Sequence, residues 1–154
     1  MKGSSISLMY GIFVAVGLIA YFLLLSLFGL HTNPAFSVVN IAITGIGMFL
    51  AIKKYRSKKG AKFIYEKGFT TALATGFIAT LIFTGFFAIY ASELNPNFSE
   101  ELITMWETDW FVNLGMLVFT VALMGLATSF VMALAIMQRY KPSWNTKEGK
   151  KHTY

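Results

Sequence analysis

Basic residues crowd into one short stretch of the chain, and they are the side chains best suited to binding chemistry. Residues 52–69 read IKKYRSKKGAKFIYEKGF and hold seven of the thirteen Lys and Arg residues. Such clusters beside a membrane helix are the expected signature of contact with anionic lipid headgroups, and an acidic partner protein would use the same groups. The candidate contact residues are Lys53, Lys54, Arg56, Lys58, Lys59 and Lys62.

Residue patterns for other chemistry are missing from the sequence. The chain contains no cysteine, which excludes disulfides, thiolate metal sites and thiol nucleophiles. It has no glycine-rich phosphate-binding loop, no EF-hand spacing and no pair of histidines placed to hold a metal or haem. We therefore expect neither an enzyme nor a bound cofactor or metal. The net charge of +6 does not indicate nucleic-acid binding, because the basic residues lie between long apolar runs.

The composition indicates a membrane protein. Only 13% of the residues are charged and 56% are hydrophobic, whereas soluble domains carry about 25% charged residues. A helix needs about 20 apolar residues to cross the hydrocarbon layer, and uncharged stretches of about that length occur at 7–30, 36–52, 69–91 and 111–137. We predict an all-α integral membrane protein with a single four-helix transmembrane domain over residues 1–154.

Charges outside these spans are divided by sign. All thirteen basic residues lie at the N-terminus, in a loop at 53–68 or in a tail at 138–154, whereas five of the seven acids lie in the loop at 92–110. Cytoplasmic loops carry an excess of Lys and Arg, so both termini are predicted to be cytoplasmic. In the simpler interpretation of the basic loop, it is a topogenic signal with a solvated surface that faces the lipid headgroups.

The acidic outer loop, SELNPNFSEELITMWETDW, contains signals for a short helix. Asn95 and Pro96 end the third span, and acidic residues then occupy a new first turn, where they are favourable. Apolar residues recur at helical spacing up to Trp106 and Trp110. We predict an amphipathic helix that lies flat on the outer surface, with both tryptophans as anchors at the headgroup level.

None of the four spans contains an ionisable residue. This counts against a proton-coupled pump or an intramembrane protease, which need such groups inside the membrane. The spans carry small and hydroxylated residues at helix-packing spacing, and two amides that would pair between the second and fourth spans. The predicted packing residues are Gly76, Thr80, Thr84, Gly125, Ser129, Asn40 and Asn113.

A recurring order of residues runs through the middle of the chain. A basic segment opens with Lys-Tyr-Arg, a glycine and an aromatic residue follow, a glycine-rich span comes next, and an Asn-Pro pair leads into acidic residues. These positions are Lys54, Tyr55, Arg56, Gly60, Phe63, Gly68, Phe69, Gly76, Asn95, Pro96, Phe98, Glu100 and Glu101, and the first span opens with Met9, Tyr10 and Gly11. In this order the chain resembles a family of small four-helix membrane proteins of the Bacteroidota, the domain of unknown function DUF4199. The resemblance implies a protein of a Gram-negative inner membrane and brings no activity or catalytic residues with it.

Two functions of different classes fit these observations. The first is a non-enzymatic accessory, scaffolding or assembly subunit of a larger inner-membrane complex, with lipid headgroups and other membrane subunits as partners. The alternative is a homo-oligomeric carrier or channel for a small or lipid-like solute, with threonines of the third span lining the path. A membrane enzyme is disfavoured, because the sequence offers no convergent acid, base or metal ligand.

Overall fold

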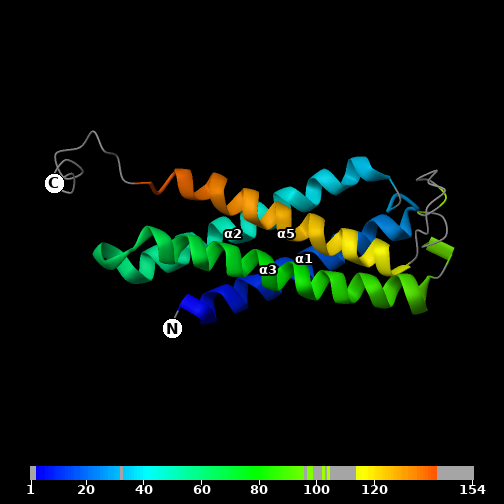
Figure 1. The fold of residues 1–154 in the computed structure, drawn as a ribbon, viewed down its shortest axis with the longest axis horizontal. Helices are drawn as coiled ribbons and strands as arrows, with labels where there is room; N and C mark the ends of the chain where they lie inside the picture. Colours follow the sequence, from blue (N-terminus) through cyan, green and yellow to red (C-terminus); the bar gives the residue numbers. More distant parts are fainter. Residues whose placement is uncertain are drawn as a thin grey trace.

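The computed structural model describes residues 3–31, 33–95, 97–98, 102, 104 and 114–141, and all regular structure within them is helical (Figure 1). Four of the described helices have the length and apolar composition needed to cross a membrane. For the described residues, the prediction of an all-α fold with four helices able to span a membrane is therefore confirmed, which indicates a multi-pass membrane protein. The long helices are α1 (Gly3–Leu27), α2 (Ser37–Lys59), α3 (Tyr65–Ile89) and α5 (Leu114–Gln138). The short ones are the 3-10 turns η1 (Pro34–Phe36) and η2 (Gly60–Lys62) and the π-helical turn η3 (Tyr90–Leu94).

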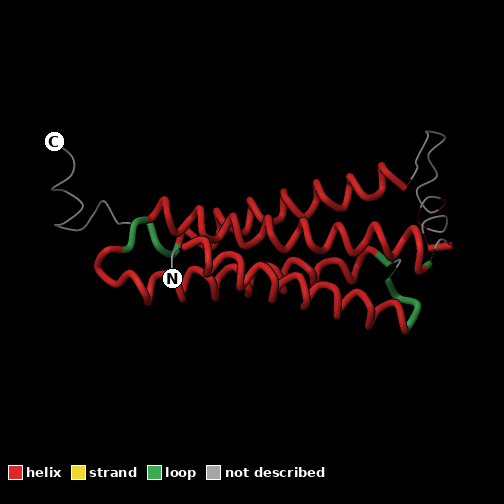
Figure 2. The backbone as a smooth tube through the Cα atoms, turned by 90° about the horizontal axis from the view of Figure 1, so that it is seen from below, coloured by secondary structure: helices red, strands yellow, loops and turns green. Residues whose placement is uncertain are grey.

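The long helices form an elongated bundle in which α3 packs against α1, α2 and α5. Figure 2 shows them running lengthwise beside one another, with connections gathered at the two ends. The start of α1, the turn between α2 and α3, and the last turn of α5 share one end (Figure 1). We call this the basic end, because it carries residues 53–67 and 139–141. We call the other end, which carries η1 and η3, the distal end.

α1 ends at Leu27, three residues before the predicted border of the first span at Leu30. Gly29 adopts a φ of 66°, the backbone NH of Leu30 donates to the carbonyl of Leu25 at 2.9 Å, and that of Gly29 donates to the carbonyl of Ser26 at 3.1 Å. This is a Schellman motif, in which a glycine past the last turn satisfies free carbonyls. The apolar run continues to Leu30, so hydropathy alone does not mark this end.

α2 continues seven residues beyond Ile52, where the predicted second span ends, and stops at Lys59. The predicted basic loop at 53–68 is therefore mostly helical, and α3 begins as early as Tyr65. Lys and Arg are good helix formers, and cations in a last turn interact favourably with the negative end of the helix dipole. Gly60, at a φ of 51°, turns the chain toward α3.

Several predicted features lie outside the described residues. Trp106, Trp110, Asn113 and the tail beyond Lys141 are among them, so the interfacial helix with its anchors stays a prediction, as does the orientation of the termini. The described residues of that segment are helical: Asn97, Phe98, Leu102 and Thr104. α3 leads into η3, which ends at Leu94; the backbone NH of the next residue, Asn95, donates to the carbonyl of Tyr90 at 2.8 Å. The helix thus stops at the Asn-Pro pair, as predicted.

Candidate functional site

The two predicted stripes of small residues meet each other in the contact between α3 and α5. A Cβ added at Gly76 would lie 2.5 Å from both Cβ and Oγ of Ser129, and one added at Gly125 would lie 2.6 Å from Cγ2 of Thr80. The hydroxyls of Thr80 and Ser129 are 3.4 Å apart, and that of Ser129 also donates to the carbonyl of Gly125 at 2.8 Å. Small residues let helix backbones approach closely. The two stripes therefore pack α3 against α5 within one chain.

Two predicted packing residues take no part in this contact network. The Oγ1 atom of Thr84 and the Oδ1 atom of Asn40 are buried, and neither has a hydrogen-bond partner among the described residues. Asn113, the predicted partner of Asn40, lies outside the described residues. The pairing of these two amides between the second and fourth spans therefore stays a prediction.

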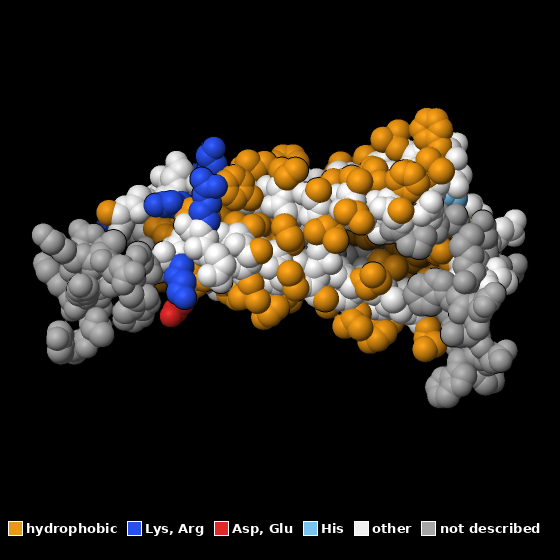
Figure 3. Space-filling view, turned by 90° about the horizontal axis from the view of Figure 1, so that it is seen from above, with side chains coloured by type: hydrophobic (Ala, Val, Ile, Leu, Met, Phe, Trp, Pro, Cys, Tyr) orange, Lys and Arg blue, Asp and Glu red, His pale blue; other side chains and the backbone are white. Residues whose placement is uncertain are grey.

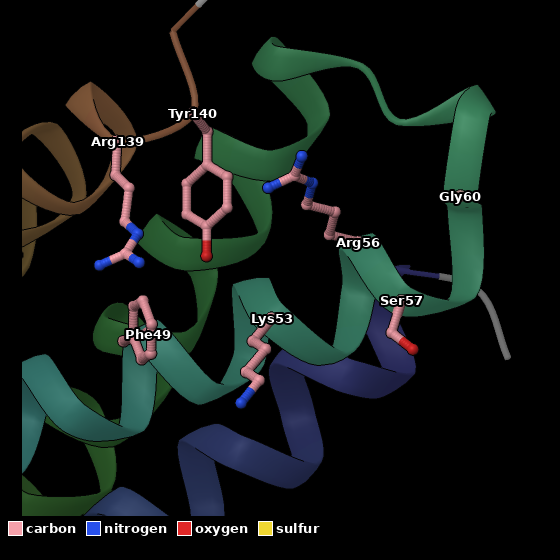
Figure 4. A pocket seen from close by; sticks show the side chains of 7 residues that line it. All are labelled: Phe49, Lys53, Arg56, Ser57, Gly60, Arg139 and Tyr140. Carbon is pink, nitrogen blue, oxygen red and sulfur yellow. The ribbon is translucent and has the colours of Figure 1, made fainter.

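An open hollow with a volume of about 580 Å³ lies at the basic end, between the last turns of α2 and α5 (Figure 4). Its wall combines cationic, aromatic and hydroxyl side chains with one glycine of the connecting turn. The lining residues are Phe49, Lys53, Arg56, Ser57, Gly60, Arg139 and Tyr140. We call this feature the basic hollow.

Aromatic rings hold both guanidinium groups of the basic hollow. The guanidinium carbon of Arg56 lies 5.1 Å from the ring centre of Tyr140 and 5.9 Å from that of Phe63. The guanidinium carbon of Arg139 lies 6.0 Å from the ring centre of Phe49. In Figure 4 the ring of Tyr140 stands between the two arginines. A cation–π contact restricts an Arg side chain and leaves its other N–H groups able to donate hydrogen bonds.

The basic hollow concentrates positive charge. Lys53, Arg56 and Arg139 contribute three cations to its wall, and among the described residues none of the three has a carboxylate within ion-pairing distance. Figure 3 shows Lys and Arg side chains gathered at this end of the molecule, whereas apolar side chains cover the stretch between the ends. Like charges held close together repel, so an anion that enters between them relieves that repulsion. The arrangement is suited to binding phosphate or carboxylate oxygens rather than to bond-breaking chemistry.

Comparison with protein-family models shows the family to which the chain belongs. Residues 9–139 match the family model described as "Protein of unknown function (DUF4199)", and this range runs from α1 to the end of α5. The chain belongs to the DUF4199 family. No curated protein and no solved structure matches it. The family resemblance seen in the sequence is confirmed, and an origin in the Bacteroidota stays a prediction.

In this DUF4199 protein, only some of the predicted contact residues line the basic hollow. Lys53 and Arg56 line it, whereas four predicted lysines of the same stretch do not. Those four are Lys54, Lys58, Lys59 and Lys62. Sequence reasoning missed Arg139 and Tyr140, which come directly after the fourth span. The sequence could have indicated these two residues, because the predicted second and fourth spans end on the same side of the membrane. Arg139 and Tyr140 therefore lie on the same side as Lys53 and Arg56.

A second feature of this DUF4199 protein that the sequence analysis did not predict is an aromatic cluster at the distal end. Phe22 is 8% exposed and makes edge-to-face contacts with six rings. Phe98 is 2% exposed and stacks on His31, with ring centres 4.6 Å apart. The hydroxyls of Tyr90 and Ser26 lie 2.6 Å apart at its edge. The cluster packs Phe98 against residues of α1 and α3 at this end of the bundle.

Proposed function

We propose that the protein is a non-enzymatic, multi-pass protein of a bacterial inner membrane that serves as an accessory, scaffolding or assembly subunit of a larger complex. The observation that carries this proposal is the open face of α5. In the most apolar stretch of α5 only 17% of the residues are buried, compared with 28% to 33% in α1, α2 and α3. Among the four described long helices, α5 therefore leaves the largest share of its apolar stretch open to another membrane protein.

The exposed face of α5 has the form of a helix-packing ridge. Its members are spaced four residues apart and alternate in part between large and small side chains. They are Phe119, Leu123, Ala127, Val131 and Ala135, and all are exposed. Ridges of this spacing fit into the grooves of a neighbouring helix, and small residues within them allow close approach in a membrane. Contact with lipid does not require a ridge of this form, whereas packing against a partner helix does.

The alternative function, a homo-oligomeric carrier whose threonines line a path, has less support. Thr80 is 6% exposed, and its side chain packs against Gly125 within the same chain. A path lined by Thr80 would have to separate α3 from α5. A flux assay in proteoliposomes that showed transport, and its loss on changing Thr80 or Thr84 to valine, would restore this alternative.

Partner association is tested on the tagged full-length chain, purified from its native membrane in mild detergent and analysed by native mass spectrometry. Ala127→Trp puts a bulky ring into the α5 ridge, and a clash that costs about 1.4 kcal/mol lowers partner affinity about tenfold. We expect stoichiometric partner subunits with the unchanged chain and their loss with this variant. Ala20→Trp is the matched control, because Ala20 is an exposed alanine of α1. Recovery of a bare chain, or equal recovery of partners with both variants, would contradict the proposal.

The proposed orientation, with the basic end in the cytoplasm, rests on the division of charge along the sequence. Because the chain has no cysteine, single cysteines report their own side of the membrane. Glu93→Cys, at the exposed distal end, should react with a membrane-impermeant maleimide in cells whose outer membrane has been permeabilised. Lys62→Cys, exposed at the basic end, should react only after the inner membrane is disrupted. The reverse labelling pattern would show that the orientation is inverted.

A further inference from the structure

We propose that the basic hollow binds the phosphate group of an anionic phospholipid, with Arg56 and Arg139 donating hydrogen bonds to it from the two sides of the Tyr140 ring. The inference rests on the aromatic support of both guanidinium groups, the absence of a paired carboxylate among the described residues, and the apolar surface onto which the hollow opens. It does not depend on the partner proposed for α5.

The two arginines are held in advance of binding. The guanidinium group of Arg56 makes cation–π contacts with Tyr140 and Phe63, and that of Arg139 makes one with Phe49. A guanidinium group already restricted by a ring loses less freedom when it binds. Its planar edge matches two phosphate oxygens, which a lysine ammonium group does not. The arginines, rather than the flexible lysines around them, should therefore provide most of the selectivity.

Position favours a lipid over a soluble phosphate compound. On α2, Ile46, Leu50 and Lys53 follow one another at spacings of four and three residues, so they share one face of the helix. Ile46 is 62% exposed and Leu50 is 42% exposed. An apolar strip thus runs from Lys53 toward the middle of the bundle. Acyl chains of a phospholipid would lie along this strip while its phosphate enters the basic hollow.

Charge favours an anionic lipid over a zwitterionic one. The lining residues of the hollow include three cations, and they include no carboxylate that would hold an ammonium or choline group. A volume of about 580 Å³ is of the size of a small-molecule site rather than of an extended groove. An acidic segment of a partner protein would need a longer contact that also used Lys54 and Lys62, which lie outside the hollow.

The test measures lipid binding to the full-length chain in a neutral detergent, where no charged membrane surface attracts lipid non-specifically. Phosphatidylglycerol is titrated and the bound fraction is read by native mass spectrometry. Arg56→Gln with Arg139→Gln should weaken binding at least about tenfold, because one lost hydrogen bond to a charged group is enough for that change. Lys54→Gln with Lys62→Gln removes the same charge from outside the hollow and should leave affinity within about twofold.

Two further ligands decide between the sources of the anion. Phosphatidylcholine should bind at least about tenfold more weakly than phosphatidylglycerol, and glycerol 1-phosphate should not displace the lipid. Equal effects of the two double variants, equal binding of both lipids, or displacement by glycerol 1-phosphate would each overturn the proposal. Because Arg56 also packs on rings, Lys53→Gln provides a variant free of those contacts, and it should weaken binding without lowering the unfolding temperature. An unchanged affinity for this variant would also count against the site.

Discussion

Replacing Gly76 with valine is expected to destabilise the bundle by roughly 2–3 kcal/mol, the upper part of the usual cost of overpacking a core. The β-carbon alone would lie 2.5 Å from Cβ and Oγ of Ser129 and 3.2 Å from Sδ of Met48. Ser129 is fully buried, so its side chain has no free space to move into. The two helices must therefore separate, which also breaks the contact between the hydroxyls of Thr80 and Ser129. The free energy of unfolding, measured by SDS titration in mixed micelles with near-UV circular dichroism, checks this result.

Gly85 provides the matched control for this substitution. It lies on the same helix, is exposed, and has no atom within 4 Å of an added Cβ. Gly85→Val should change the free energy of unfolding by less than about 0.5 kcal/mol, as is usual for surface positions. Adding Ser129→Gly to Gly76→Ala should recover part of the stability lost by Gly76→Ala, because it removes the side chain that the new methyl group meets. Equal stability of the valine variants at the two glycines would mean that α3 and α5 do not approach as described.

The crossings could be predicted from the sequence because each needs an uncharged apolar run of a length fixed by the bilayer. The ends of the helices could not be predicted in the same way. α1 stops at Leu27 because Gly29 adopts a left-handed conformation, although apolar residues continue to Leu30. α2 continues to Lys59 because a charged residue ends a membrane crossing but not a helix. Hydropathy therefore predicts which segments lie in the membrane, whereas backbone conformation and hydrogen bonding determine where each helix ends.

The basic hollow was only partly predictable, and the reason is the assignment of residues 53–68 as a loop. Lys53, Arg56, Ser57 and Gly60 are spaced by three, four and seven residues from the first, which is one face of a helix. Had the helix been extended past Ile52, this spacing would have separated them from Lys54, Lys58 and Lys59. Arg139 could not be assigned to the hollow from this spacing, because its contact with Phe49 depends on how α5 packs on α2.

For the packing stripes of α3 and α5, the residues and their spacing could be predicted from the sequence. The surface against which each stripe packs could not. Small residues at four-residue spacing fit another part of the chain, a second copy or a different protein equally well. The short distances between Gly76 and Ser129 and between Gly125 and Thr80 place the contact within one chain. The proposed association with other subunits would therefore have to use other surfaces, and the α5 ridge is the candidate.

Replacing Phe22 with alanine is expected to destabilise the bundle by about 2–3 kcal/mol, less than the largest values for buried Phe in soluble proteins. Its ring lies 4.9 Å from that of Tyr90 and 5.8 Å from those of Phe98 and His31. Lipid tails are as apolar as the protein interior, so transfer out of water contributes little in a membrane. What is lost is packing, since the cavity left by the ring removes contacts from every neighbour at once.

Phe13 provides the comparison, because it lies on the same helix but is 63% exposed and contacts one ring, that of Tyr10. Phe13→Ala should lower the free energy of unfolding by less than about 1 kcal/mol. Near-UV circular dichroism should also separate the two variants, because only Phe22→Ala disturbs the environment of Tyr90. A stability equal to that of Phe13→Ala would mean that the distal cluster contributes no more than lipid contact does. A larger loss for Phe22→Ala would show that the distal cluster stabilises the bundle beyond what contact with lipid provides.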